Sequence, residues 1–388
     1  MKILYHHRIA SKDGQYVHIE EIISALTESD HEIIVVAPES TDAKSFGESS
    51  SLVKRIRRLL PDSLHEVAEF LYCFWDFLKI SIAVLKHRPD VIYERYNLFF
   101  PSGIWAKKLF DIPLLLEVNS PLLDERSKHG GLSLSRLAKW SETYCWKNAD
   151  FLLPVTGVLG RIIESSGADA NKIVVIPNGV NKKNFYEVEK NAEICRQLNL
   201  CGKLVLGFVG FVREWHGLER VVDVLKKHED KPWVMLVVGD GPALKDVKQR
   251  AQTLGIEDKL ITTGVVDREN VSSYMSSFDI ALQPDVVAYA SPLKLFEYLA
   301  LSKPVLAPDT ENIREILDSE QNGLLFDPKN NEDFSNKLEA LCLSDELRSK
   351  LGAGAAMLIE DRQLYWRTNA DKIVELMLTT QTKESVCE

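Results

Sequence analysis

The sequence predicts an α/β protein with two domains, each built on a doubly wound parallel sheet. Its 388 residues exceed the usual size of a single domain. Short apolar runs alternate with helical patterns along the chain, which is typical of parallel strands joined by covering helices. The hydrophobic content of 45% and the charged content of 27% are those of an ordinary globular protein.

The charge balance argues against general affinity for nucleic acid, because the formal net charge is −10. The acidity is uneven along the chain. Residues 1–180 contain 21 Lys and Arg against 23 Asp and Glu, a net charge of −2, which leaves −8 for the remainder. The first half is therefore the better candidate for contact with an anionic surface.

The cysteines and the start of the chain indicate a cytoplasmic protein. Six cysteines are scattered without CxxC or Cys/His spacing, which favours reduced thiols and argues against a structural zinc site. The first residues, MKILYHHR, lack the apolar segment of a signal peptide. No run of about 18 uncharged apolar residues predicts a membrane span.

Six strands are predicted in the first half of the chain. They are the apolar runs at residues 2–5, 32–37, 91–93, 114–118, 151–155 and 174–176. In parallel sheets of this kind, ligands bind beyond the carboxyl ends of the strands. The loops that follow these runs are therefore where site residues are expected.

The first loop contains Gly14 and Gln15, and a helix is expected to begin near Tyr16. His18 falls on the first turn of that helix, either facing a ligand or buried with its hydrogen bonds satisfied. After the third run, Arg95 could hold an acceptor phosphate or pair with Glu94 as part of the scaffold.

Further polar residues follow the fourth run. Glu117 and Asn119 lie at its carboxyl end, and His129 stands in a loop with two glycines. His129 reaches a ligand only if that loop folds over the site.

Residues 51–60 predict a basic amphipathic helix, with apolar side chains on one face and four Lys or Arg on the other. An aromatic-rich helix follows at residues 69–85. This pattern indicates a membrane-surface element or a lip where an acceptor enters; the alternative is a plain surface helix with a solvated charged face.

The second half repeats the alternation of strands and helices. Strands are predicted at residues 204–210, 234–238, 260–262, 280–283, 305–307 and 324–326. The turn at Gly239 has only two glycines of a dinucleotide fingerprint, and no acidic residue ends the next strand, so binding of NAD is disfavoured.

The loop GFVREWHG at residues 210–217 contains side chains suited to phosphate. The guanidinium of Arg213 matches phosphate oxygens in a bidentate way, and His216 adds a donor. Gly217 allows close approach at the helix start. The alternative is a solvated loop with Trp215 packed inward.

Residues 285–308 predict a short loop, a helix and a strand. Ser291 is a suitable N-cap and Pro292 a suitable first helical residue. Lys294 lies near the helix start and Glu297 one turn further on. Amides at the helix start suit a diphosphate, and the carboxylate suits ribose hydroxyls, although an ordinary capped helix has the same pattern.

The segment SPLKLFEYLALSKPVLA resembles the donor-site motif of family-four retaining glycosyltransferases, in the subgroup with the pattern S-P-x-K-x-F-E-Y. The resemblance covers both halves of the chain. Four segments carry it, at residues 176–180, 207–217, 237–242 and 285–308.

The resemblance implies a GT-B architecture, in which two Rossmann-like domains face a cleft. Residues 1–178 would bind the acceptor, and residues 179–362 would bind the donor. The last helix, at residues 363–388 and with Trp366 buried, would cross back to the first domain.

The resemblance also implies a reaction and a set of site residues. A hexose would pass, with retention and without a metal or other cofactor, from a nucleoside-diphosphate sugar such as a UDP-sugar to a cell-surface polysaccharide or lipid-linked acceptor. The implied catalytic residues are Arg213, Lys294, Asn119 and Glu117. The implied donor-binding residues are Gly14, Gln15, Gly210, His216, Gly239, Val265, Asp285, Ser291, Pro292, Leu293, Leu295 and Glu297. The implied acceptor residues are His18, Arg95 and His129.

Two positions depart from the family pattern. Tyr289 stands where the family usually has a first Glu, and Asn119 stands where it often has a His. A sugar-nucleotide epimerase of the same architecture, or a non-catalytic sugar-nucleotide-binding subunit, therefore remains an alternative.

Overall fold

The structure, a computed structural model, describes residues 1–10, 14–38, 62–128 and 132–384. The predicted basic helix at residues 51–60 and His129 lie outside the described residues. The chain forms two compact units. Unit 1 comprises Met1–Pro177, Tyr289–Ser291 and Trp366–Glu388, and unit 2 comprises Asn178–Ala288 and Pro292–Tyr365.

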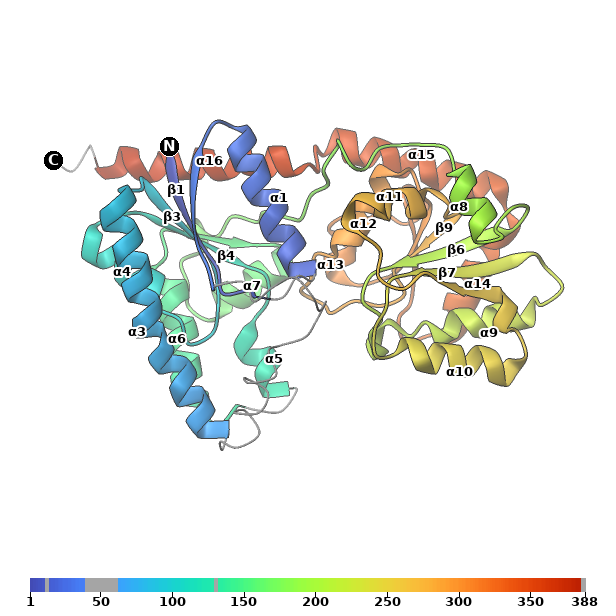
Figure 1. Cartoon of the computed structure of the whole chain (residues 1–388), viewed down its shortest axis with the longest axis horizontal. Coiled ribbons are helices and arrows are strands. Elements are labelled where there is room, and N and C mark those ends of the chain that lie inside the picture. Colours follow the sequence, from blue (N-terminus) through green and yellow to red (C-terminus); the bar gives the residue numbers. More distant parts are fainter. Residues whose placement is uncertain (11–13, 39–61, 129–131, 385–388) are drawn as a thin grey trace. The chain divides into compact units, whose positions relative to one another are not determined.

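Unit 1 is built on a parallel sheet of five strands in the order β2-β1-β3-β4-β5 (Figure 1). The strands are β1 (Lys2–His6), β2 (Glu32–Val36), β3 (Val91–Arg95), β4 (Leu114–Val118) and β5 (Phe151–Pro154). The order reverses between β1 and β3, so the carboxyl ends of these two strands mark the switch point of the sheet.

The sixth strand predicted in the first half, at residues 174–176, is wrong. Val174 and Ile176 each donate one backbone hydrogen bond of 2.9 Å to β5. Val175 between them is 40% exposed, and Pro177 ends the segment. The segment therefore runs beside β5 without forming a strand of the sheet.

Helices cover both faces of this sheet. They are α1 (Gly14–Glu28), α3 (Asp62–His87), α4 (Ser102–Phe110), α5 (Leu122–Lys128), α6 (Ser135–Asn148), α7 (Gly157–Ser165) and α16 (Trp366–Glu384), with a 3-10 turn at Ala170–Lys172. The aromatic-rich helix predicted at residues 69–85 lies within α3, which packs side by side with α4 (Figure 1).

The last helix, α16, packs against α1, as Figure 1 shows. Trp366 is buried, as predicted, and its ring centroid lies 4.9 Å from that of His18. Arg367 also donates a hydrogen bond of 2.8 Å to the carbonyl of Glu28. The helix begins three residues later than predicted, because Gln363 has a φ of 51° and separates it from the preceding helix.

Unit 2 is built on a parallel sheet of six strands in the order β11-β10-β9-β6-β7-β8. The strands are β6 (Leu204–Val209), β7 (Trp233–Val238), β8 (Leu260–Thr262), β9 (Ile280–Leu282), β10 (Val305–Pro308) and β11 (Leu324–Phe326). All six predicted strands of this half are confirmed. The order reverses between β6 and β9, which makes their carboxyl ends the expected ligand edge.

The helices of unit 2 bury an apolar core on each face of this sheet. They are α8 (Ala192–Gln197), α9 (Glu219–Lys227), α10 (Leu244–Leu254), α11 (Arg268–Ser276), α12 (Leu293–Ala300), α13 (Glu311–Arg314), α14 (Asn331–Leu343) and α15 (Asp345–Asp361), with 3-10 turns at Glu214–His216 and Glu257–Lys259. Within the described residues, no helix combines the length and the hydropathy that crossing a bilayer requires.

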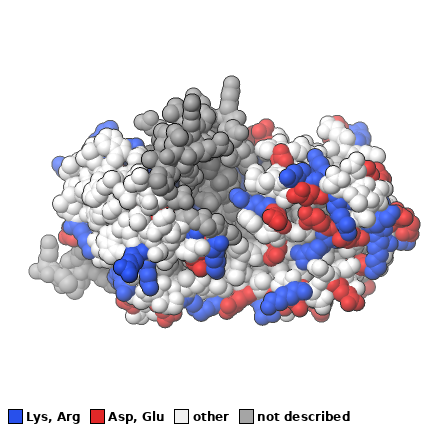
Figure 2. Space-filling view, turned by 90° about the horizontal axis from the view of Figure 1, so that it is seen from below, with Lys and Arg blue, Asp and Glu red and all other residues white. Residues whose placement is uncertain are grey.

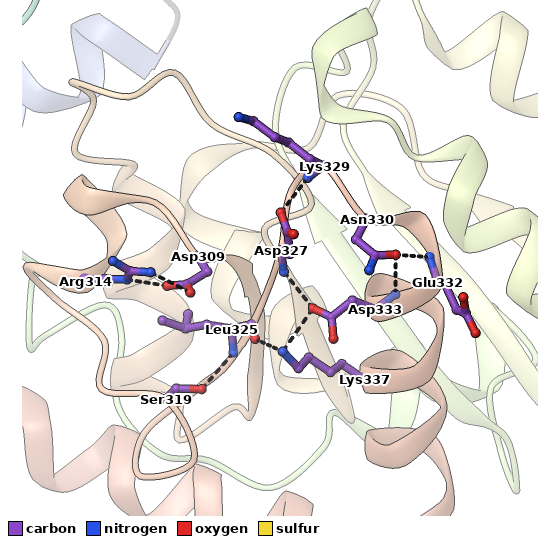
Figure 3. Close-up of polar contacts among 10 residues, drawn as sticks. All are labelled: Asp309, Arg314, Ser319, Leu325, Asp327, Lys329, Asn330, Glu332, Asp333 and Lys337. Carbon is purple, nitrogen blue, oxygen red and sulfur yellow. Dashed lines mark hydrogen bonds and ion pairs between the residues drawn. The ribbon is translucent and has the colours of Figure 1, made fainter.

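Polar contacts fix the start of α14 to the end of β11 (Figure 3). Asn330 caps the helix by accepting a hydrogen bond of 3.1 Å from the amide of Asp333. The carboxylate of Asp333 accepts from the amide of Asp327 at 2.7 Å and from Lys337 at 3.0 Å. Lys337 also donates to the carbonyl of Leu325 at 2.6 Å, so strand and helix are joined.

Candidate functional site

The loops after β6 and β9 lie at the switch point of the unit 2 sheet, and the second leads into α12. Pro292 is the N-cap of α12, with φ −74° and ψ 117°, and no side chain caps the helix. The predicted cap, Ser291, is wrong: Ser291 belongs to unit 1 and is buried there. The helix start therefore lacks a side-chain acceptor of its own.

Two backbone amides at the start of α12 are candidates for an anion. Leu295 donates its amide to the carbonyl of Pro292 at 3.0 Å, so the predicted contribution of that amide is taken up within the helix. Over the described part of the chain, the amides of Leu293 and Lys294 have no such acceptor. Helix N-termini attract anions through these amides and the helix dipole.

The ammonium group of Lys294 lies beside the ring of Phe208 and the backbone of Gly210. Its Nζ atom is 3.9 Å from the centroid of the Phe208 ring. A Cβ atom added to Gly210 would lie 3.3 Å from the same Nζ, so the ammonium group sits against the turn after β6. Burial lowers the pKa of Lys294 to about 7, although Glu297 partly opposes the shift. A bound anion would restore the full charge of this lysine.

Two glycines bring the ends of β6 and β7 into direct backbone contact. Gly210 has φ 123° and Gly239 has φ 138°, both in the region that favours glycine. A Cβ atom on Gly239 would lie 2.2 Å from the carbonyl oxygen of Gly210, which leaves no space for a side chain. This contact requires glycine at position 239, and the role of the two glycines in donor binding stays a prediction.

His216 is buried beside the same turn. Its Nδ1 atom accepts a hydrogen bond of 3.0 Å from the backbone amide of Arg213. Burial, followed by the charges of Lys294 and Arg213, lowers the pKa of His216 to about 3. The ring is therefore neutral at physiological pH and carries its proton on Nε2.

The Arg213 guanidinium is exposed and lies 5.0 Å from the ring centroids of both Phe211 and Trp215. Trp215 is 48% exposed, so the alternative of an inward-packed Trp215 is wrong. Gly217 adopts the left-handed conformation, with φ 57°, directly before the next helix. The loop thus presents one aromatic-stacked guanidinium and one neutral imidazole donor.

Glu297 lies buried one turn into α12 and forms an ion pair of 2.6 Å with Arg268. Arg268 begins α11 and lies over the ring of Phe185 at 4.9 Å. Arg268 was not predicted as a site residue, because a contact between two helices leaves no local pattern in the sequence. The carboxylate of Glu297 is therefore held in place by a neighbouring cation.

The remaining predicted donor residues lie on loops. Asp285 follows β9, and its carboxylate accepts from the amide of Val286 at 2.7 Å. Val265 is 56% exposed after Gly264. Gly14 and Gln15 begin α1 in unit 1, and among the described residues a Cβ atom on Gly14 has no neighbour recorded within 4 Å.

In unit 1, the predicted residues at the ends of β3 and β4 meet around Glu117. Arg95 donates to Oε1 of Glu117 at 2.5 Å, and Asn119 donates to the same oxygen. Tyr93 donates to Oε2 at 3.0 Å. Burial alone would raise the pKa of Glu117, but His18 and then Arg95 hold it below its usual range. This carboxylate is a weak base whose oxygens are occupied.

Arg95 and His18 are both buried, with Nη1 of Arg95 2.7 Å from Nδ1 of His18. Burial lowers the pKa of His18 to about 4, so its neutral ring accepts from Arg95. The predicted pairing of Arg95 with Glu94 is wrong. Glu94 instead contacts His6 at 3.0 Å, because the two strand ends place that histidine closer.

Tyr289, the departure from the family pattern, is anchored in unit 1. Its hydroxyl donates to the carboxylate of Glu125, and its carbonyl accepts from Thr156 at 2.8 Å. Burial and the contact with Glu125 raise the pKa of the Tyr289 phenol. Tyr289 therefore serves as a neutral anchor for this loop.

Over the described residues, no group of three or more His, Cys, Asp or Glu side chains is arranged to hold a metal ion. The charges that act on the buried His216 are those of the cations Lys294 and Arg213.

Family models match both halves of the chain. The family model described as glycosyl transferases group 1 matches residues 190–357, and the model described as glycosyltransferase family 4 matches residues 12–184. Both halves of the protein thus match glycosyltransferase families. The match to the narrower subgroup motif rests on the sequence resemblance alone.

Two curated relatives of this glycosyltransferase illustrate its similarity. An α-D-kanosaminyltransferase of Streptomyces kanamyceticus is 20% identical over 65% of this chain and 67% of that protein. A phosphatidyl-myo-inositol mannosyltransferase of Mycobacterium leprae is 27% identical over 58% of this chain and 57% of that protein. The matched segment thus spans between about half and two thirds of these relatives.

The solved structures show the same fold. Anabaena HepE in complex with UDP superposes with a TM-score of 0.76 and 18% identity, over 98% of this chain and 100% of that chain. The GT-B fold predicted from the sequence is therefore confirmed.

Proposed function

We propose that the protein transfers a hexose-type sugar from a nucleoside-diphosphate sugar to a lipid-linked or cell-surface polysaccharide acceptor. The transfer retains the anomeric configuration, needs no metal or other cofactor, and takes place in the cytoplasm at the inner face of the membrane. The observation that carries the proposal is the meeting of Lys294, His216, Arg213 and the start of α12 at the switch point of the unit 2 sheet.

The electrostatics of this place favour a phosphate-bearing ligand. Lys294 is desolvated enough to lose its charge near pH 7, so a nearby anion stabilises its protonated form. Glu297, the nearest acidic contributor, is already paired with Arg268. The UDP complex of HepE, which shares the fold, supports a UDP-sugar as the donor.

The proposed reaction breaks the bond between the anomeric carbon and the diphosphate. Negative charge develops on the departing phosphate oxygen, where Lys294, Arg213 and the Nε2–H group of His216 stabilise it. The acceptor hydroxyl attacks from the same face, and its proton passes to that departing oxygen. The acceptor hydroxyl is itself the nucleophile, so none from the protein is required. The leaving group acts as the base.

Glu297 is proposed to accept hydrogen bonds from the ribose of the donor. Its ion pair with Arg268 fixes the side chain, so little conformational freedom is lost on binding. Asp285, Val265 and the turns at Gly210 and Gly239 would complete the donor site.

Residues of unit 1 are proposed to meet the acceptor. The oxygens of Glu117 are occupied, so this carboxylate would position Asn119 and Arg95 rather than accept a proton. His18 shares this buried group. The inositol lipid named for the Mycobacterium leprae relative supports a lipid-linked acceptor.

A non-catalytic subunit that binds sugar nucleotides is the second candidate. Tyr289 favours it, because the phenol of this residue is engaged with Glu125 where the family usually has a carboxylate. An epimerase of the same architecture would turn over the donor without an acceptor.

The test is a panel of UDP-, GDP- and ADP-sugars, screened first for thermal stabilisation of the full chain. The stabilising donor is then supplied with lipid-linked acceptors, with and without EDTA, and the anomeric configuration of the product is determined by NMR. We expect transfer with retention that EDTA does not affect. Binding without transfer to any acceptor would favour the subunit, and turnover of donor alone would favour the epimerase.

A further inference from the structure

Helix α3 carries apolar side chains on two opposite sides. On one side, Cys73, Ile80 and Val84 are buried against the sheet. On the other side, eight apolar side chains are 38–67% exposed: Leu64, Val67, Leu71, Phe74, Trp75, Leu78, Ile82 and Leu85. Their spacing of three or four residues, with one adjacent pair, places them on one face over about 32 Å.

An exposed stripe of this length needs a partner. A helix that is apolar all round is normally buried all round, and large exposed apolar patches mark interaction sites. In Figure 2 the surface of unit 1 that is not grey is mostly free of charge, whereas the surface of unit 2 carries dense charge of both signs.

The acidic side chains of α3 whose positions are described are all engaged elsewhere. Glu66 is buried, and Glu69 forms an ion pair of 2.7 Å with Arg126. Asp76 is buried against His6 at 3.0 Å. The exposed stripe is therefore free of competing negative charge from these residues.

Aromatic contacts continue this surface from α3 to α6. The ring centroids of Phe70 and Trp140 are 6.1 Å apart, and Trp140 stacks on Tyr144 at 5.3 Å. Lys108 lies over the ring of Tyr144 at 4.8 Å. Trp140 is 45% exposed, and Trp and Tyr side chains favour the boundary between water and lipid.

A shallow groove beside these rings is basic. It is lined by Arg136, Lys139 and Lys147, all exposed and all on one face of α6. None of these cations has an ion-pair partner in the part of the chain that the structure describes. The groove thus offers three uncompensated positive charges next to an apolar stripe.

We propose that this surface docks in the plane of an anionic lipid bilayer. The membrane face, defined as the eight exposed apolar residues of α3 together with Trp140, Arg136, Lys139 and Lys147 of α6, would insert its apolar side chains among the acyl chains. Its cations would contact lipid phosphates. This inference deepens the proposed function and rests on its membrane location, which it assigns to described residues of α3 and α6; it does not depend on the donor, and it uses none of residues 51–60.

Charge complementarity favours a bilayer over a second copy of the chain. In a symmetric dimer this face would meet itself, and the acidic side chains of α3 whose positions are described are already engaged, so they could not pair with the cations of α6. Anionic lipids satisfy the apolar stripe and the cations together.

The test is sedimentation of the full chain with lipid vesicles. The vesicles contain phosphatidylcholine, either alone or with about 30 mol% phosphatidylglycerol to give an anionic surface. We expect binding to the anionic vesicles that weakens as salt rises, because salt screens the cations. The double variants Leu71→Ser/Trp75→Ser and Arg136→Glu/Lys139→Glu are each expected to lower the vesicle partition coefficient about tenfold or more.

Matched controls lie on unit 2. Leu343→Ser/Met357→Ser removes two equally exposed apolar side chains, and Lys245→Glu/Lys248→Glu reverses two exposed charges on α10. Neither should change vesicle binding. The unfolding midpoint and the shift produced by UDP should be unchanged in every variant, which separates loss of docking from misfolding and from failure of the donor site.

Three results would overturn the inference. They are equal binding to both kinds of vesicle, anionic binding that survives both membrane-face variants, and a dimer in solution that Leu71→Ser/Trp75→Ser dissociates while no vesicles are bound. The last result would assign the face to a second copy of the chain.

Discussion

The backbone amide of Arg213 donates a hydrogen bond to Nδ1 of His216 at 3.0 Å, and this contact decides which nitrogen of the ring is available. Because Nδ1 accepts, the neutral ring keeps its proton on Nε2. The pKa of about 3 keeps the ring neutral at physiological pH. His216 is thus expected to donate one hydrogen bond to a phosphate oxygen without adding charge.

Replacing His216 by Ala should reduce kcat/KM about a hundredfold, or about 2.7 kcal/mol, because one preorganised donor to developing charge is lost. The ratio of wild-type to variant kcat/KM should stay constant between about pH 5.5 and 8, since His216 does not titrate there. His228→Ala, outside the site, is the control. A ratio that changes around pH 6.5 would show that the imidazolium form acts instead.

Lys294→Ala and Arg213→Ala should each lower kcat by roughly a hundred- to thousandfold, or about 3–4 kcal/mol. Both side chains are assigned to the departing diphosphate. Steady-state kinetics with saturating donor measures the effect, and Lys245→Ala, an exposed lysine on α10, is the control. Near-normal turnover in both variants would remove the assigned roles.

Donor binding should take up protons above pH 7. The pKa of Lys294 is about 7 in the empty site, so the lysine loses its charge as pH rises, and a bound diphosphate restores it. Donor affinity should therefore fall as pH increases from 7 to 9. Calorimetry in two buffers of different ionisation enthalpy should show uptake near one proton at about pH 8 and little at about pH 6.

The lysine is the source of that uptake, so Lys294→Ala should abolish it. Uptake that persists in Lys294→Ala would assign the titration to another group.

Glu297→Gln should raise the donor KM about tenfold or more, with a smaller effect on kcat, because the ribose loses a charged acceptor. Arg268→Ala should have a weaker effect in the same direction, since Arg268 is 35% exposed and acts by holding Glu297. Glu269→Gln, next to Arg268 and exposed, should leave KM unchanged. Donor titrations monitored by thermal shift provide an independent measure of affinity.

His6 should make the stability of the protein depend on alkaline pH. The ring is buried between Asp76 and Glu94, at 3.0 Å from each. Burial opposes protonation, but Asp76 and then Glu94 raise the pKa of His6 to about 9. The folded value exceeds the unfolded value of about 6.5, so the stabilisation is complete below pH 6.5 and is lost as pH rises through 9.

The contribution of His6 to the free energy of unfolding that is lost at alkaline pH is of order 3 kcal/mol. Chemical denaturation at about pH 6.5 and pH 9.5 measures it, and the same experiment on His6→Gln is the comparison. The variant should be less stable at the lower pH and should approach the wild type at the higher pH. Parallel curves for the two proteins would contradict the assignment.

Much of unit 2 could be predicted because most of its strands are short, apolar and buried, as β7 illustrates. The loops of the candidate site followed from the rule that ligands lie beyond strand ends. The predicted strand at residues 174–176 failed because an apolar run with Pro177 at its end can run beside a sheet without joining it.

Contacts between elements that lie far apart in the sequence could not be predicted. Arg95 was placed at a strand end, but its choice of Glu117 over Glu94 depends on how β3 and β4 pair. Ser291 has the side chain of an N-cap, yet the chain carries it into unit 1. The ion pair of Arg268 with Glu297 joins two helices whose sequences contain no signal of each other.

The membership of α16 in unit 1 has a consequence for how the protein is made. Unit 1 consists of the first 177 residues, three residues from the middle and the final helix, whereas unit 2 lies almost wholly in one continuous stretch. During translation, unit 1 therefore cannot complete its fold until α16 has been synthesised, while unit 2 has all its parts earlier. The order of maturation is thereby opposite to the order of synthesis, and a premature stop before Trp366 would leave helix α1 without its neighbour.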